Sequence, residues 1–310
     1  MENKTVALKK LSMKNREQKW GFFFIMPWLI GFLVFYAVPI ISSLIFSFLN
    51  YNLIEPDKTT FVGLGNWKRA LFQDPQIIES IGHIMQYTII ALPLSLGFSI
   101  IAAILLNNKH LLGAKLFRTL YYIPTMVPLV ATVLIWRGVL NEQTGWINLI
   151  LQNLGFEGQR WLASTKLIYF SYAFIGLWGC GNTIVIFLAG LQGVPESLYE
   201  ASLIDGANGW QRFTKITVPL MTPVIFYNLL TGIINMMQYF LVPMVINQGS
   251  GFPDGKTNFP MVLFYRHSFS YFNMGYGAVI AWIIFLIGLI FTLVLFGTSN
   301  KWVYYAGEKK

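Results

Sequence analysis

Six stretches of this chain are long and apolar enough to cross a lipid bilayer, and they constrain its fold more than any other feature. A helix needs about 20 apolar residues to span the hydrocarbon core. The qualifying stretches are Trp20–Leu49, Ile81–Leu106, Thr119–Trp136, Leu167–Leu191, Pro219–Ile246 and Met274–Gly297. Only 11% of the 310 residues are charged, against about 25% in a soluble domain. The sequence therefore predicts an all-α integral membrane protein with six transmembrane helices. The first stretch is too long for a signal peptide and is expected to be retained.

The distribution of Lys and Arg predicts the orientation of these helices. Cytoplasmic loops of membrane proteins carry an excess of Lys and Arg. With the N-terminus inside, the inner segments hold 14 of the chain's 22 such residues and the outer segments hold 8. We therefore predict that both termini are cytosolic. The expected parts are a basic N-terminal tail (1–19), a six-helix transmembrane domain (20–297) with an inner loop at 192–218, and a C-terminal tail (298–310).

The sequence lacks the residues that several functional classes of protein require. The six stretches contain no Asp, Glu, Lys or Arg, whereas proton-coupled carriers place ionisable groups at membrane depth; a secondary carrier is thus a remote alternative. The segment Gly249–Thr257 is not a phosphate-binding loop, because Ser250 stands where the G-x-x-x-x-G-K-[ST] pattern needs its first glycine. One cysteine and three scattered histidines give neither a disulfide nor a metal site. We expect no catalytic residue, cofactor or metal in this chain, and no nucleic-acid partner.

One inner loop is polar and acidic where neighbouring segments are apolar. It reads PESLYEASLIDGANGWQRF from Pro195 to Phe213. Pro195 suits the first position of a helix, a glycine elbow around Gly206 ends that helix, and Trp210–Ile216 can form a second one. A helix resting on lipid would favour Lys and Arg, whereas this one begins with Glu196. Docking on a partner protein is therefore favoured over an interfacial helix, although both remain open from the residues alone.

The same loop resembles the signature of inner-membrane permease subunits of binding-protein-dependent ABC importers. The signature is E-A-A, three residues to a glycine, then nine residues to I-x-L-P. This chain has Glu200-Ala201-Ser202, Gly206 and Ile216-Thr217-Val218-Pro219, with Ser202 in place of Ala and Val218 in place of Leu. Further segments are similar to the carbohydrate-uptake, maltose-permease-like branch: Phe61–Leu71, Phe117–Asn148 and Phe272–Trp282. The resemblance spans nearly the whole chain from the first helix onward.

The resemblance implies a multi-pass permease domain in the cell's inner (cytoplasmic) membrane that pairs with a second homologous permease. Two cytosolic ABC ATPase subunits would bind ATP and Mg, and an extracytoplasmic binding protein would deliver a carbohydrate, expected to be an oligosaccharide. A polyol, a glycerol-phosphate compound or another organic solute remains an alternative. The loop 192–218 would be the coupling helix in a cleft of the ATPase. The expected ATPase-coupling residues are Glu200, Ala201, Ser202, Asp205, Gly206 and Ala207.

Polar residues at membrane depth are the candidates for a solute path. Thr125 lies between two prolines of the third stretch, and Trp178, Gly179 and Asn182 lie within about one turn of each other in the fourth. In the fifth, Asn235, Gln238 and Tyr239 have the spacing i, i+3, i+4 and are expected to share one helix face. In the branch that the chain resembles, the same helices line the path. The alternative is that such residues join helices or mark the membrane interface.

Overall fold

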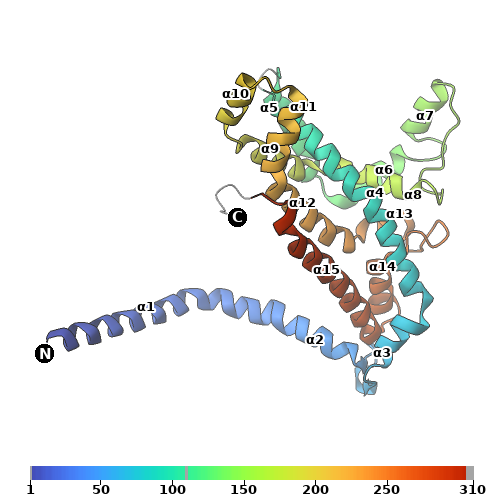
Figure 1. Ribbon diagram of the computed structural model, residues 1–310. Coiled ribbons are helices and arrows are strands. Elements are labelled where there is room, and N and C mark those ends of the chain that lie inside the picture. The colour runs from blue at the N-terminus through green and yellow to red at the C-terminus, as the bar shows by residue number, and fades with distance from the viewer. Residues whose placement is uncertain (1, 109–110, 305–310) are drawn as a thin grey trace.

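The chain folds into helices of very unequal length with one small sheet, and α1 projects away from the rest (Figure 1). The computed structural model describes residues 2–108 and 111–304, with side chains from residue 17 onward. The longest helices are α1 (Glu2–Phe32), α4 (Pro75–Leu106), α12 (Val218–Met237) and α15 (Met274–Trp302), and α2 (Val38–Ser47) follows α1 after one π-helical turn. The shorter α-helices are α3 (Gly65–Lys68), α5 (Ala114–Tyr122), α6 (Leu129–Val139), α7 (Trp146–Asn153), α8 (Ile168–Trp178), α9 (Gly181–Gln192), α10 (Glu196–Ile204), α11 (Gly209–Arg212), α13 (Leu241–Asn247) and α14 (Pro260–Tyr265). Single turns of π- or 3-10 helix are η1 (Leu33–Ala37), η2 (Pro56–Lys58), η3 (Arg69–Gln73), η4 (Ile123–Met126), η5 (Phe213–Thr217) and η6 (Arg266–Ser270).

Four helical segments in the described part of the chain are long and apolar enough to cross a membrane. They are residues 17–47, 75–106, 209–247 and 274–302, and two bent helix pairs raise the number to six if each pair is one span. The segments Ala114–Met126 and Leu129–Val139 meet at 102°, and α8 and α9 meet at 61°. The sequence predicted one transmembrane helix at each bent pair and did not predict the bends. The first bend follows from Pro128, which disfavours helix at the preceding Val127; the second contains Gly179 and Gly181, whose helix propensity is low.

From residue 17 onward, the first helix leaves most of its surface uncovered. The helix α1 continues without a break past residue 19, the predicted end of the N-terminal tail. It then passes through η1 into α2. The most apolar window of residues 17–47 contains no buried residue. α2 packs against α15, where Trp282 Nε1 donates to Ser43 Oγ at 3.2 Å. An exposed apolar helix of this length requires lipid or another subunit around it.

Two buried clusters hold the bundle together. The larger one joins α4, α8, α14 and α15, and includes the fully buried Tyr87, Tyr172 and Tyr276. The smaller one joins α4, α9 and α12 around Phe187. The sheet is a two-residue antiparallel pair of β1 (Leu49–Asn50) and β2 (Thr60–Phe61), with Leu49 opposite Phe61. The long α4 contributes to both clusters, as does α12, through Met237 in the larger and Met221 in the smaller.

The start of α9 packs very closely against the preceding bent span. A Cβ added at Gly181 would overlap the carbonyl oxygen of Tyr121 and lie 2.8 Å from Thr125 Cγ2. Because a backbone atom cannot move aside cheaply, we expect Gly181→Ala to cost about 1 to 3 kcal/mol and to lower the thermal unfolding midpoint of the detergent-solubilised protein. Gly176→Ala is the matched control, since a Cβ there meets no atom within 4 Å. Equal midpoints for the two variants would contradict the close approach.

Candidate functional site

The loop 192–218 forms α10 and a glycine elbow, as the sequence predicted, but its second helix, α11, continues through η5 into α12 instead of ending as a separate short helix. At the end of α10 the N–H of Gly206 donates to the carbonyl of Leu203 at 3.1 Å, and the N–H of Ala207 donates to that of Ser202 at 2.9 Å. This pair of hydrogen bonds satisfies the last carbonyls of a helix. It requires that the residue after the helix C-cap adopt the left-handed backbone conformation. Gly206 supplies it with a φ of 75°. The glycine elbow predicted at Gly206 is therefore present.

Two details of the loop differ from the prediction or were missed by it. Pro195 is the residue before α10, with an extended ψ of 128°, and not its first helical residue. Pro195 still marks the boundary of the helix, because it has no backbone N–H and cannot donate a helical hydrogen bond. α11 begins with a reciprocal capping box: Asn208 Oδ1 accepts from the N–H of Gln211, and Gln211 Oε1 accepts from the N–H of Asn208, both at 2.9 Å. The spacing of a capping residue and Gln three positions later is readable from sequence.

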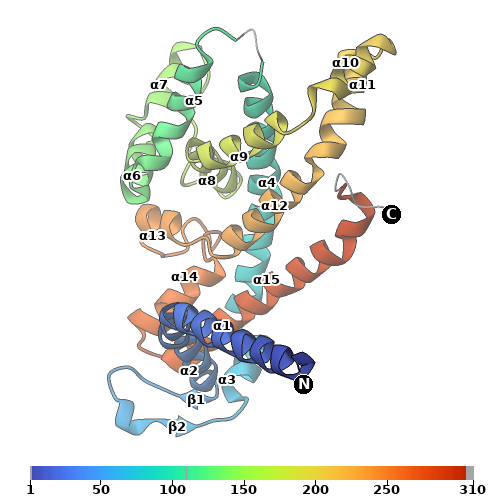
Figure 2. The same cartoon turned by 90° about the vertical axis from the view of Figure 1, so that its left-hand side faces the viewer.

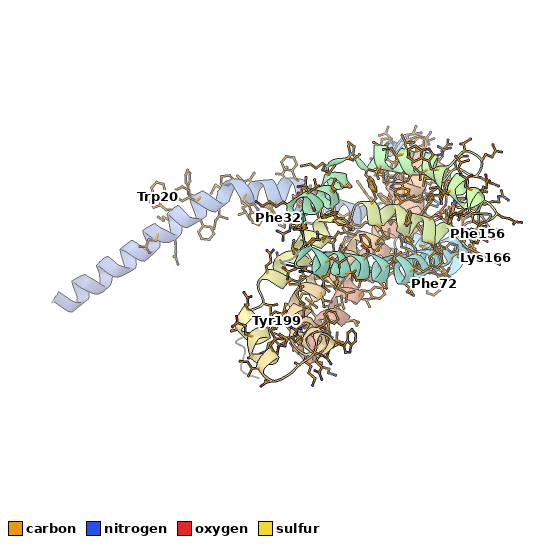
Figure 3. All side chains as sticks on the ribbon, turned by 90° about the horizontal axis from the view of Figure 1, so that it is seen from above. Trp20, Phe32, Phe72, Phe156, Lys166 and Tyr199 are labelled. Atoms are coloured by element: carbon orange, nitrogen blue, oxygen red, sulfur yellow. The ribbon has the colours of Figure 1, made fainter. Side chains whose placement is uncertain are left out.

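A side-chain hydrogen bond fixes α10 to the start of the following long helix. Tyr199 Oη and Thr217 Oγ1 lie 2.9 Å apart, and Thr217 immediately precedes α12. Ser202 Oγ donates back to the carbonyl of Tyr199 at 2.7 Å. Figure 3 labels Tyr199 on this peripheral part of the molecule. This hydrogen bond therefore links α10 directly to the N-terminal end of α12.

The two short helices present an apolar surface outward. Ile204 is 89% exposed and Trp210 is 71% exposed, and α10 and α11 lie side by side at one end of the molecule (Figure 2). Of the predicted coupling residues, Glu200, Ala201, Asp205 and Gly206 are exposed, whereas Ser202 and Ala207 are partly buried. Large exposed apolar side chains beside small and acidic ones are typical of a protein-binding surface. We call Glu200–Ala207 together with Trp210 the docking surface.

A polar cavity lies next to the docking surface. It measures about 660 Å³, lies between α10 and the segment 107–118, and is lined by Arg118, Arg212, Glu196 and Glu200 among others. Nε of Arg118 and of Arg212 is buried without a hydrogen-bond partner among the described atoms. Glu200 thus stands at the border between this cavity and the exposed face of α10. Its carboxylate can face either the chain's own arginines or a partner.

A second group of predicted residues meets in one cavity. Thr125, Trp178, Gly179, Asn182 and Tyr239 all line a cavity of about 250 Å³. They come from three places where a membrane-spanning segment is interrupted: between η4 and α6, between α8 and α9, and between α12 and α13. Irregular backbone at membrane depth is tolerated only where protein buries it or where it lines a water-filled cavity. The three interruptions therefore converge on the cavity that they create.

The walls of this cavity combine aromatic faces with a few polar groups. The Tyr239 ring lies 4.6 Å from that of Tyr87, and its Oη is buried without a partner among the described atoms. The Trp178 indole meets Trp136 edge to face at 5.7 Å. Thr125 Oγ1 donates to the carbonyl of Tyr122 at 2.7 Å, which leaves its lone pairs available as acceptors. Flat apolar faces with a few placed polar groups are typical of a small-molecule site.

The predicted shared face of Asn235, Gln238 and Tyr239 is wrong. α12 ends at Met237, and the N–H groups of Gln238 and Tyr239 turn back to the carbonyls of Asn235 and Met236. This tight turn rotates the three side chains away from helical register. Tyr239 lines the cavity, Gln238 lines a separate groove of about 370 Å³ between α12 and α15, and Asn235 is exposed on α12. The sequence also missed Thr132, the further polar side chain of the cavity wall.

Comparison with known proteins assigns this architecture to a family. Residues 95–299, about two thirds of the chain, match the model of the "Binding-protein-dependent transport system inner membrane component". The chain belongs to this family. The assignment confirms the resemblance seen in the sequence, and the predicted helical membrane permease fold with it. This inner membrane component is therefore a transporter subunit and not itself the catalyst of a reaction.

Individual relatives align with this inner membrane component along nearly its full length. It is 36% identical over 307 residues to the probable ABC transporter permease protein YesP of Bacillus subtilis (strain 168), covering 98% of each chain. It is 33% identical over 283 residues to the arabinooligosaccharides transport system permease protein AraP of the same organism, covering 90% of this chain and 88% of the relative. A solved bacterial ABC transporter involved in the import of the acidic polysaccharide alginate contains a chain of similar fold. The TM-score is 0.77 at 20% identity, covering 93% of this chain and 98% of that chain.

Proposed function

We propose that this chain is a permease subunit of an ABC importer and forms, with a second homologous permease, the path for ATP-driven uptake of a carbohydrate. The observation that carries the proposal is the cavity at which three interrupted spans meet. The family's description supports delivery by an extracytoplasmic binding protein, and the name of the relative AraP supports an oligosaccharide as the solute. The exposed first helix is available to a second permease.

The docking surface is proposed to receive a cytosolic ABC ATPase, one of two that bind ATP and Mg. Glu200, Ala201, Ser202, Asp205, Gly206 and Ala207 would provide the contact. The Tyr199–Thr217 hydrogen bond joins this contact to α12. α12 is 20 residues long, which corresponds to about 30 Å, and it ends two residues before Tyr239 in the cavity wall. A movement of the ATPase would therefore reach the cavity through one continuous helix.

The topology that fits this arrangement has six spans, with the two bent pairs counted as one span each, and both termini in the cytosol. The docking surface and the basic N-terminal segment then lie on the inner side of the cell membrane, where ATP is found. Residues 20–297 form the transmembrane domain, flanked by the terminal segments 1–19 and 298–310. The higher number of Lys and Arg in the inner segments supports this orientation.

The cavity supports a neutral solute. Among the described residues that line it, none is Asp, Glu, Lys or Arg, so an anionic group would find no counter-charge from this chain. A glycerol-phosphate compound is disfavoured on this ground, and a polyol remains the closest alternative to a sugar. Hydroxyl groups can bond Thr125 and Asn182 while a ring face packs on Trp178. We propose these three side chains, together with Gly179 and Tyr239, as the part of the path that this chain provides.

ATP hydrolysis by the assembled complex tests this function. The chain is co-expressed with the products of its neighbouring genes, and hydrolysis is measured in nanodiscs with a panel of neutral mono- and oligosaccharides. We expect stimulation that requires both a binding protein and one class of sugar, because only the loaded binding protein completes the transport cycle. Hydrolysis that does not respond to any combination of the two, in a complex that contains all subunits, would contradict the proposal.

A further inference from the structure

The loop between α6 and α8 carries a helix with no charged residue and an exposed apolar side. α7 reads WINLILQN, and Trp146 is 71% and Ile150 59% exposed. Leu149, Leu154 and Phe156 are also exposed and extend the same surface. We call these five residues the α7 apolar face. Figure 1 shows α7 standing apart from the bundle, and Figure 3 shows Phe156 near the opposite end of the molecule from Trp20 of α1. An apolar surface of this size is costly in water.

A buried asparagine holds α7 so that the α7 apolar face stays exposed. The Asn148 side chain is fully buried, and its Nδ2 donates to the carbonyls of Glu142 and Gln159, both at 2.9 Å. Its Oδ1 accepts from the N–H of Gln159 at 2.9 Å and from Trp161 Nε1 at 2.8 Å. One amide therefore fastens both flanks of the loop to the inner side of α7. The α7 apolar face is held on the other side of the helix, where it cannot fold back onto the chain.

The connection to α6 keeps α7 close to the membrane. α6 ends at Val139 and α7 begins at Trp146, so seven Cα–Cα steps separate them, which is about 25 Å even when fully extended. The two helices also contact each other directly. On α6, Leu134 and Ile135 are exposed and apolar within a candidate span. The surface next to α7 thus already requires an apolar environment, and the α7 apolar face continues it.

The charges of the loop lie outside α7. Glu142 and Arg160 form an ion pair with 3.2 Å between Arg160 Nε and Glu142 Oε2, and Glu157 follows the apolar face at an exposed position. A segment with a tryptophan-containing apolar side and charged flanks matches the membrane–water boundary, where amphipathic rings are enriched. A helix of this kind inserts its apolar side into the region between headgroups and acyl chains.

We propose that α7 lies in the outer membrane–water interface and inserts its apolar face into the lipid of the outer leaflet. The choice of leaflet rests on the orientation proposed above; the lipid contact itself does not. Anchored in this way, α7 fixes the ends of α6 and α8, which carry the two bends that border the solute cavity. The partner is the lipid surface, not the binding protein.

Spin labels at two positions of the loop test the proposal in the assembled complex. In a Cys180→Ala background, which removes the single cysteine, Ile150→Cys and the matched Glu157→Cys are labelled and placed in phosphatidylcholine nanodiscs. We expect the label at 150 to be more accessible to oxygen than to a water-soluble nickel chelate, and the label at 157 to show the reverse. Labelling of Glu157→Cys in intact cells by a membrane-impermeant thiol reagent assigns the leaflet.

Two outcomes would overturn this inference. Access of the nickel chelate to both labels would show that the α7 apolar face is in water. Protection of the label at 150 only after addition of the binding protein would show a protein-docking surface instead. Both measurements are independent of transport. If the label at 150 is buried in lipid but the unsubstituted complex shows no uptake that depends on ATP and the binding protein, the proposed function alone is refuted. Normal uptake with a water-exposed label would refute the lipid contact alone.

Discussion

Gly206→Val is expected to abolish solute uptake while the permease remains inserted and assembled. Gly206 has a φ of 75° at the end of α10, and no atom lies within 4 Å of a Cβ built there. The effect of a side chain is therefore backbone strain and not a clash. A β-branched residue in this conformation costs about 1 to 2 kcal/mol, which shifts the conformational equilibrium of the elbow roughly fivefold to thirtyfold. The docking surface would then lose the shape that fits the ATPase. Uptake in proteoliposomes measures the loss.

The control series separates strain from other causes. Gly206→Asn should retain most of the uptake, because asparagine tolerates the left-handed conformation. Gly209→Ala should be near parental, since its Cβ meets only the end of the Arg212 side chain at 4.0 Å. Charge reversal by Glu200→Lys should abolish uptake through the same surface without backbone strain. Parental uptake in both Gly206→Val and Glu200→Lys would refute the assignment of this loop as the coupling element.

Asn182→Ala is expected to weaken the apparent affinity for solute, with a smaller effect on protein stability. Asn182 lines the cavity at the break between α8 and α9 and offers both a donor and an acceptor to a hydroxyl group. Loss of one neutral hydrogen bond costs about 0.5 to 1.5 kcal/mol, so KM for uptake should rise roughly threefold to tenfold. Initial uptake rates over a range of loaded binding protein and solute concentrations measure the change.

Gln238→Ala is the matched control for the cavity. Gln238 adjoins Tyr239 in sequence, but its side chain lines the groove between α12 and α15 instead. Its substitution should leave KM within about twofold of the parental value, a difference of less than 0.5 kcal/mol. Equal increases in KM for Asn182→Ala and Gln238→Ala would contradict the placement of the path in this cavity. Unchanged KM in both variants would place the main solute contacts on the second permease.

Local patterns in the sequence predicted the backbone structure of the loop 192–218 well. The acidic start, the small residues and the glycine elbow are short-range signals, and α10, the left-handed Gly206 and α11 follow from them directly. The assignment of the loop as a docking element came from charge that does not suit lipid, and it still depends on the uptake tests above. The exact start of α10 at Glu196, rather than at Pro195, and the continuation of α11 into α12 needed the structure.

The membrane-embedded part was less predictable, because hydropathy counts apolar residues and does not report bends. The third and fourth stretches gave a span signal, but the 102° and 61° bends depend on Pro128 and on the glycines near Cys180 acting within a packed bundle. The same limit explains the error at Gln238: helical spacing was assumed across a point where the helix ends. The cavity of Thr125, Trp178 and Tyr239 exists because of these interruptions, so its composition was predictable and its geometry was not.

Uptake of labelled neutral sugars into proteoliposomes tests the central claim most directly. The complex of this chain with its partner permease and ATPases is reconstituted, with ATP enclosed or omitted, and with the binding protein present or absent on the outer side. The account predicts accumulation of one class of oligosaccharide only when ATP and binding protein are both present. Accumulation driven by an ion gradient in vesicles that contain this chain without any ATPase would contradict it.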